Sequence, residues 1–235
     1  MKLNLKSKNI LITGSTEGIG LSIAHSFLKE GSNVCISSRR KKKTDYIKKK
    51  LSDKYEKSEI LSFNCDFTNR SSVVSLRKRI IKKWNNIDVV VCNVGSGIGS
   101  KSYIPNSKNW NSSWKNNFES ALISAQIFSK DLEKSSGSLV FISSIAGVEF
   151  INAPTEYSVA KSAVITLARN MSSKLEGKFR VNVIAPGNII FEGGTWDKKI
   201  KEDNEQVYKM IKDKVPLGRF GKPEEVGNLC AFLCS

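Results

Sequence analysis

The sequence predicts a single α/β domain in which a doubly wound, parallel β-sheet lies between two layers of helices. Short runs of apolar and β-branched residues alternate with longer amphipathic stretches, which is typical of repeated strand–helix–strand units. The short runs are almost continuously apolar, as expected of strands that are buried on both faces. A length of 235 residues suits one domain around one core. Residues 1–235 are therefore expected to form one three-layer domain.

The elements are predicted in chain order from these runs. The first helix should span residues 18–30 and end there, because Gly31 can adopt a positive φ angle. Further helices should fill the gaps between the strands. Six strands are expected, at residues 9–13, 33–38, 59–65, 88–93, 138–143 and 179–185.

Two loops follow predicted strands at their carboxyl ends, where open α/β sheets bind ligands. The first is the glycine-rich stretch 95–100, and the second is a long insertion at 188–214. The insertion combines glycines that can flex with Phe191 and Trp196, whose rings can cover a small molecule. We therefore expect a ligand site at this edge, with residues 188–214 as its substrate lid.

Charge and composition exclude several classes of function. The 38 Lys and Arg against 22 Asp and Glu give a net charge of +16, which would attract acidic partners. Residues 39–50 hold eight of the basic groups, but no aromatic interleaving accompanies them, so a solvated helix face is expected rather than nucleic-acid binding. With His25 as the single histidine, a multi-histidine metal centre is excluded and no metal site is expected. No apolar run reaches membrane-spanning length, and five cysteines in apolar stretches fit reduced thiols, so a cytoplasmic protein is expected.

A glycine-rich turn, TGSTEGIG at residues 13–20, comes directly after the first predicted strand and opens the first predicted helix. Glycines let the backbone turn tightly and approach a diphosphate, whose charge is met by the amides of the helix N-terminus. The turn therefore predicts a site for a phosphate-containing ligand.

The turn resembles the TGxxxGIG cofactor turn of the short-chain dehydrogenase/reductase family, and further motifs of that family follow in order over nearly the whole chain. Ser144 lies thirteen residues before Tyr157, and Tyr157 to Lys161 matches the YxxxK motif. Residues 93–95 resemble Asn-Ala-Gly, 186–187 the turn on the nicotinamide side, and 218–226 the GRxGxPEEV motif. The motif style is similar to that of the 3-oxoacyl-acyl-carrier-protein reductases.

The resemblance implies a Rossmann fold and a catalytic tetrad formed by Asn117, Ser144, Tyr157 and Lys161. Ser144 would hydrogen-bond the substrate oxygen, Lys161 would also hold the nicotinamide ribose, and Asn117 would support a water-linked proton path. The cofactor site implied by the same resemblance comprises Gly14, Ser15, Thr16, Gly18, Ile19, Gly20, Ser38, Arg39, Asp66, Asn93, Gly95, Tyr157, Lys161, Pro186, Gly187 and Ile189.

The spacing of Tyr157 and Lys161 also has a physical meaning, because residues i and i+4 of a helix share one face. A free phenol has a pKa of about 10, too high for ready proton exchange at neutral pH. An ammonium group about 5 Å away would lower the pKa by about two units. Tyr157 is therefore expected to act as the general acid in carbonyl reduction and as the base in the reverse direction.

The end of the second predicted strand indicates the cofactor. NAD enzymes usually carry a carboxylate there, but this chain has Arg39 and Arg40, which favour the extra phosphate of NADP. Glu17 argues in the other direction, since many NADP-using relatives have Lys or Arg at its position.

Two departures from the family pattern leave alternatives open. Phe191 replaces a threonine that hydrogen-bonds the cofactor, and the chain stops at Ser235, where the family continues into a last strand and a tail. One sheet edge is therefore expected to lack its strand, and the usual tetramer is in doubt, although a homo-oligomer (dimer or tetramer) is still expected.

The leading hypothesis is an NADP-dependent oxidoreductase that interconverts a carbonyl and a secondary alcohol. The small-molecule substrate would be a 3-oxoacyl thioester on an acyl carrier protein or, alternatively, a sugar or polyol. A further alternative is an NADP-binding homologue with little or no catalysis, which would serve as a regulator or scaffold. A nucleic-acid-binding module is the hypothesis that the sequence supports least.

Overall fold

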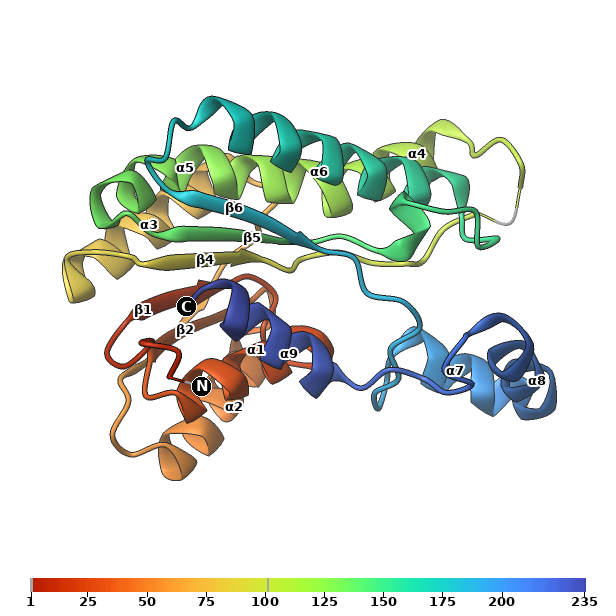
Figure 1. The fold of residues 1–235 in the computed structure, drawn as a ribbon, viewed down its shortest axis with the longest axis horizontal. Helices are drawn as coiled ribbons and strands as arrows, with labels where there is room; N and C mark the ends of the chain where they lie inside the picture. Colours follow the sequence, from red (N-terminus) through yellow and green to blue (C-terminus); the bar gives the residue numbers. More distant parts are fainter. Residues whose placement is uncertain (1, 101) are drawn as a thin grey trace.

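The computed structural model describes residues 2–100 and 102–235, and it has the predicted three-layer architecture (Figure 1). Its sheet has the strand order β3-β2-β1-β4-β5-β6, and every neighbouring pair is parallel. All six predicted strands are confirmed, most of them shorter by one or two residues. Their bounds are Asn9–Ile12 (β1), Asn33–Ser38 (β2), Ile60–Asn64 (β3), Val89–Cys92 (β4), Ser138–Ile142 (β5) and Arg180–Ile184 (β6). β6 is the last strand among the described residues and lies at one edge of the sheet.

Helices cover both faces of this sheet (Figure 1). One face is covered by α1 (Gly18–Lys29), α2 (Lys41–Lys54) and α9 (Pro223–Leu233). The other is covered by α3 (Arg70–Trp84), α5 (Ser120–Ser135) and α6 (Thr155–Lys174), with α4 (Ser107–Trp114) leading into α5. The first helix ends one residue before its predicted boundary, and Gly31 has the expected positive φ of 76°.

The alternation of side chains along each strand builds a separate apolar core on each face of the sheet. On β1, for example, Ile10 and Ile12 pack toward α1 and α9, whereas Leu11 packs toward the opposite layer. Each of these three side chains is fully buried. The sheet is therefore fixed from both sides, and so are the loops at its carboxyl edge.

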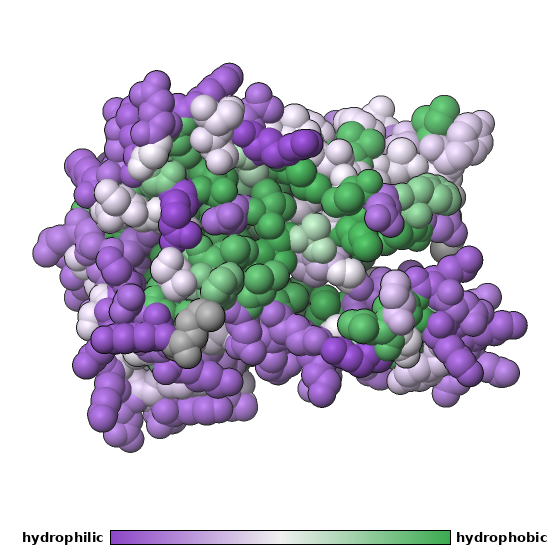
Figure 2. Space-filling view, viewed as in Figure 1, coloured by the Kyte–Doolittle hydropathy of each residue, from purple (hydrophilic) through white to green (hydrophobic). Residues whose placement is uncertain are grey.

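The chain from residue 188 to residue 222, called here the α7–α8 segment, lies beside the three layers rather than within them (Figure 1). It contains α7 (Thr195–Glu202) and α8 (Asn204–Lys214) and has a small apolar cluster of its own around Val207, Ile211 and Phe220. Figure 2 shows a mainly hydrophilic surface over this segment, in contrast to the broad apolar area near β6 and α9.

No helix among the described residues is long and apolar enough to span a membrane. In the same part of the chain, no group of three or more His, Cys, Asp or Glu side chains is arranged to hold a metal ion.

Candidate active site

The glycine turn joins β1 to α1 and has the backbone that its sequence predicts. Gly14 and Gly18 have φ angles of 62° and 54°, in the region that favours glycine. A Cβ atom at Gly20 would lie 2.5 Å from both the Asn93 side-chain nitrogen and the Gly14 carbonyl oxygen, so only glycine fits there. The Asn93 Nδ2 atom in turn donates hydrogen bonds of 3.0 Å to the carbonyl oxygens of Thr13 and Gly14. Asn93 therefore holds the shape of the turn.

The turn fits the diphosphate of a dinucleotide. Glu17 occupies the N-cap of α1, but its side chain caps no backbone amide of that helix. The first amides of a helix lack partners within the helix, and they carry partial positive charge. The amides at the start of α1, which include those of Gly18 and Ile19, can therefore receive a phosphate group.

Two of the predicted cofactor residues have side chains that serve the fold. Ser15 is fully buried, and its Oγ atom donates to Ile12 O at 2.8 Å and accepts from Ser37 N at 2.9 Å. Thr16 is 3% exposed. The Ser15 amide also donates to Ser37 O at 3.0 Å, so both the side chain and the amide of Ser15 serve the fold.

The predicted residues around an adenosine lie at the ends of β2 and β3. Ser38 shares a 2.8 Å hydrogen bond with Thr44, and Arg39 is exposed, with its carbonyl oxygen accepting from Asn64 Nδ2 at 2.9 Å. Asp66 accepts from the backbone and the hydroxyl of Thr68 at 3.0 and 2.8 Å. These contacts fix the backbone of both strand ends and leave the Arg39 guanidinium group at the surface.

Glu17 and the basic residues after β2 form an ion cluster that the sequence did not predict. The Glu17 carboxylate contacts Lys43 Nζ and also accepts from Arg40 Nη2 at 2.9 Å. Burial raises the pKa of Glu17, but Lys43 and Arg40 outweigh this effect and hold the pKa below its usual range. Arg40 is thus engaged by a carboxylate, whereas Arg39 is not.

The structure brings the predicted tetrad together beside this turn, at the carboxyl ends of β4 and β5. A Cβ atom at Gly95 would lie 2.8 Å from Asn117 Oδ1 and 3.0 Å from Lys161 Nζ, so both side chains meet at this glycine. The Lys161 ammonium group lies 5.9 Å from the centre of the Tyr157 ring. Ser144 is close enough to Tyr157 for its hydroxyl to lower the phenol pKa.

Asn117 lies in a π-helical turn, Lys115–Glu119, between α4 and α5. Its side chain accepts from Ser96 N at 2.9 Å and donates to Ser96 O at 3.1 Å and to Ser113 O at 3.0 Å. Single π turns within helices are frequent at functional sites. Here the π turn places the buried side-chain amide of Asn117 so that it holds the loop after β4 beside the other three residues of the tetrad.

The expected effect of Lys161 on Tyr157 is wrong for this structure. Burial raises the Tyr157 pKa above its ordinary value, and the opposing contribution comes from Ser144 instead of Lys161. The reason is the direction of the ammonium group, which donates to Ile142 O at 2.9 Å. Burial also lowers the Lys161 pKa to about 8. Helical spacing placed the two residues on one face but did not determine where the ammonium points.

Pro186 and Gly187 lie where the chain leaves β6, and Pro186 O accepts from Ile145 N at 3.0 Å. Ile189 packs against the core layer of α1 and α9, and it pairs with Gly221 in an isolated β-bridge. The turn after β6 is thereby fixed next to the turn that carries Ser144.

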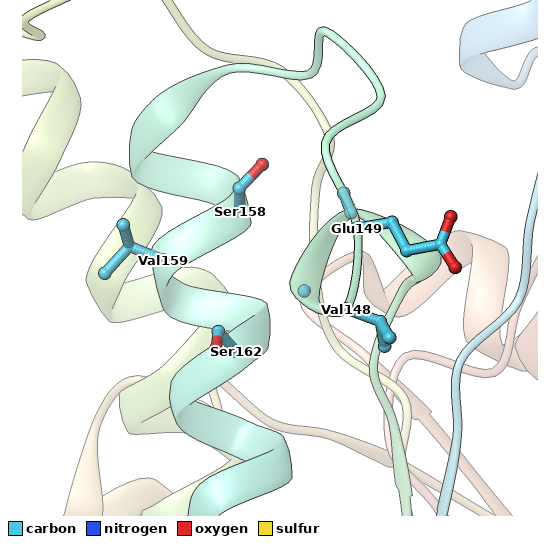
Figure 3. A pocket seen from close by; sticks show the side chains of 7 residues that line it. Val148, Glu149, Ser158, Val159 and Ser162 are labelled. Atoms are coloured by element: carbon cyan, nitrogen blue, oxygen red, sulfur yellow. The ribbon is translucent and has the colours of Figure 1, made fainter.

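Two features of the site were missed by sequence reasoning. Glu156 is 1% exposed, and its Oε1 atom accepts from Ser100 N at 2.6 Å, so it ties the loop after β4 to the start of α6. A Cβ atom at Gly147 would lie 2.7 Å from the backbone at Lys161 and at Ser162, so this glycine lets the turn after β5 touch α6. Beside this contact is an open depression of about 230 Å³ (Figure 3), lined by Ala146, Gly147, Val148, Glu149, Ser158, Val159 and Ser162. Tyr157 and Ser144 are not among the residues that line it.

Fold and site together define a dinucleotide-binding α/β enzyme. A family model described as enoyl-(acyl carrier protein) reductase matches residues 14–235. Dehydrogenase/reductase SDR family member 4 of Rattus norvegicus is 31% identical over 237 residues, which cover 98% of this chain and 82% of that protein. The chain belongs to the short-chain dehydrogenase/reductase family, and it is an oxidoreductase by that membership.

Solved structures share the fold over the whole chain. L-sorbose reductase from Gluconobacter frateurii, solved with NADPH and L-sorbose, is 26% identical and superposes with a TM-score of 0.93, covering 100% of this chain and 92% of that one. A 7α-hydroxysteroid dehydrogenase, solved with NADH and 7-oxo glycochenodeoxycholic acid, is 27% identical with a TM-score of 0.89, covering 100% and 89%.

Proposed function

We propose that this protein interconverts a carbonyl compound and a secondary alcohol with NADP(H) as its preferred cofactor. The observation that carries the proposal is the convergence of Asn117, Ser144, Tyr157 and Lys161 beside a glycine turn with uncapped helix amides. When bound, the nicotinamide cofactor supplies or accepts the hydride. The protein supplies the proton, the orientation and the exclusion of water.

Tyr157 is the proton donor in this proposal. Its raised pKa keeps the phenol protonated at neutral pH, the form that a general acid needs. Ser144 stabilises the substrate oxygen as charge develops on it. The Lys161 ammonium holds the nicotinamide ribose, and Asn117, through its contacts with Ser96, positions the loop that borders the reacting groups.

The preference for NADP rests on Arg39. This side chain is exposed at the end of β2, and no carboxylate follows that strand to repel a 2′-phosphate. A charge-assisted hydrogen bond to such a phosphate is worth about 1.5–3 kcal/mol, or about tenfold or more in affinity. The relatives do not decide the question, because one solved neighbour holds NADPH and another holds NADH.

The cofactor preference is tested first. The protein is titrated with NADPH and with NADH, and nicotinamide fluorescence reports the binding. We expect NADPH to bind at least about tenfold more tightly than NADH. Equal affinities would contradict the NADP preference, and binding of neither cofactor would contradict the proposed function. A screen of ketones, sugars and 3-oxoacyl thioesters, both free and on acyl carrier protein, then tests turnover.

Residues 188–214 of the α7–α8 segment act as the substrate lid in this proposal, since the segment lies beside the three layers (Figure 1). Buried free thiols at all five cysteines suit a reducing compartment, so we propose a cytoplasmic enzyme.

We also propose a homo-oligomer, supported by partly exposed apolar side chains of Val159, Ala163 and Leu167 along one face of α6. Light scattering of the purified protein measures that state directly.

A second candidate, binding of NADP without turnover, is favoured by Phe191, which stands where the family resemblance implies a threonine that hydrogen-bonds the cofactor. It predicts tight NADPH binding together with no carbonyl reduction by any compound in the screen.

A further inference from the structure

The ring of Phe191 lies between two glycines that are far apart in the sequence. A Cβ atom at Gly18 would lie 2.6 Å from two of its ring carbons, and one at Gly194 would lie 2.9 Å from the ring tip. The ring therefore rests on bare backbone at both places. One of the glycines belongs to the cofactor turn, and the other is the N-cap residue of α7.

The α7–α8 segment has few other attachments to the three layers. In the part of the chain that the structure describes, every hydrogen bond formed by residues 191–218 stays within those residues. Its apolar cluster is likewise its own. At its base, backbone hydrogen bonds join Ile190 to Gly221 at 3.0 Å and Gly221 to Asn188 at 2.9 Å. These hydrogen bonds fix where the segment leaves the sheet.

Gly18 begins α1, so its amide is one of those that face the diphosphate in the proposed function. The ring of Phe191 thus borders the same short piece of backbone that would hold the cofactor. We propose that Phe191 is a positioning residue that fastens the α7–α8 segment to the glycine turn, so that cofactor binding and closure of the segment are coupled. This inference rests on the proposed function for its cofactor, but the fastening itself does not.

The physical basis of the coupling is the shared backbone. A ligand that binds only the ordered turn lowers the population of open forms in proportion to its occupancy. Because the ring requires the ordered turn as its seat, the α7–α8 segment should open less often as well. Without the ring, the cofactor should order the turn alone.

Limited digestion with trypsin, followed by mass spectrometry, measures this opening directly. Lys198, Lys199 and Lys201 on α7 are exposed, so cleavage after them reports the openness of the segment. We expect saturating NADPH to slow these cuts roughly tenfold in the unaltered protein. Trp196 gives a second readout, since its emission should change when the segment closes near a nicotinamide.

Three variants separate fastening from a general loss of stability. Phe191→Ala should speed the cuts in α7 several-fold without any cofactor, and it should abolish most of their slowing by NADPH. Phe191→Tyr keeps the ring and should restore both properties. Phe150→Ala removes the same ring from a site that is 94% exposed, and it should leave the cuts unchanged.

Digestion without cofactor tests the fastening, and digestion with NADPH tests the coupling. Equal cleavage of α7 in the unaltered protein and in Phe191→Ala would overturn the fastening, whatever binds. Faster cleavage in Phe191→Ala together with undiminished slowing by NADPH would overturn the coupling. If neither protein binds a nicotinamide cofactor, the proposed function and the coupling fail, while the first arm still decides the fastening.

Discussion

The three-layer body and the α7–α8 segment are built in opposite ways. In the body, two apolar clusters enclose the sheet, and large side chains such as Phe27, Phe128 and Phe141 are completely buried. In the segment, only three residues form the buried cluster, and no residue of α7 apart from its N-cap glycine is buried. The difference shows that burial is concentrated in the body, which holds the tetrad, and is sparse in the segment.

Each region supplies what the other cannot. The body fixes Tyr157 and Lys161 on a helix packed against the sheet, because catalysis loses rate when groups shift by about 1 Å. In the proposed function the segment admits and releases ligands, and elements with such a role come from the less stable parts of a structure. If this division is correct, substitutions in the two regions should affect different observables.

The largest effect should come from the phenol in the body. Tyr157→Phe removes the proton donor but keeps the ring, so we expect turnover to fall about 10³-fold while folding is retained. Cofactor affinity, measured by fluorescence titration, should change only a few-fold. A variant that keeps more than a tenth of the original turnover would show that another group transfers the proton.

A pair of core substitutions tests the division itself. Phe128→Ala in the body should lower the free energy of unfolding by about 3–5 kcal/mol. Ile211→Ala in the segment removes a side chain that is only 2% exposed, yet it should leave the denaturation midpoint almost unchanged, because the segment opens before the body unfolds. Urea titration gives the midpoints, and trypsin reports the segment. Equal losses at both sites would mean that the segment and the body unfold as one unit.

The sequence predicted the body better than the contacts between regions, and the reason is the range of the interactions. Apolar runs and the period of side chains along a strand are local, so all six strands could be located to within two residues. The glycine turn was predictable for the same reason, since its positive φ angles are required by its own geometry.

No local sequence pattern predicted the contacts between residues that are far apart in the chain. Nothing near Asn117 in the sequence indicates a π turn or the hydrogen bonds that its side chain forms with Ser96 in another loop. The Lys161 ammonium was placed on the correct face of its helix, but Ile142 O on the neighbouring strand determines where it points. Phe191 was visible as a departure from the family pattern, whereas its seat on Gly18 is a product of the tertiary structure.

The third prediction concerns the stability cost of the Lys161 ammonium group, which is buried, in contrast to the exposed lysines of α7. Below pH 8 the folded protein keeps a buried ammonium whose pKa has fallen from 10.5 to about 8. Lys161→Met removes this cost, so the variant should unfold with a free energy higher by up to about 3 kcal/mol at pH 7, although its turnover is lost.

The change of the variant's stability advantage with pH tests this prediction. Between pH 8 and 10.5 the unfolded state binds more protons at this group than the folded state, so the stability of the unaltered protein should rise with pH relative to Lys161→Met. The advantage of the variant should therefore shrink across this range. Turnover of the unaltered enzyme should fall over the same range as the ammonium is lost. An advantage that stays constant with pH would mean that folding does not lower the Lys161 pKa.

The smallest effect should come from Glu17, which lies at the border between the glycine turn and the basic residues after β2. Its carboxylate engages Arg40 at 2.9 Å and also Lys43, so it removes two cations from the region where a 2′-phosphate would approach. Glu17→Gln should free them and tighten NADPH binding about twofold to fivefold, with little change for NADH, because surface ion pairs are worth about 1 kcal/mol or less. Glu205→Gln on α8 makes the same change of charge on the α7–α8 segment, and it should leave both affinities unaltered because exposed charges farther apart than about 10 Å are screened by salt. Equal tightening in the two variants would assign the effect to net charge, and no tightening in Glu17→Gln would mean that Arg39 alone meets the phosphate.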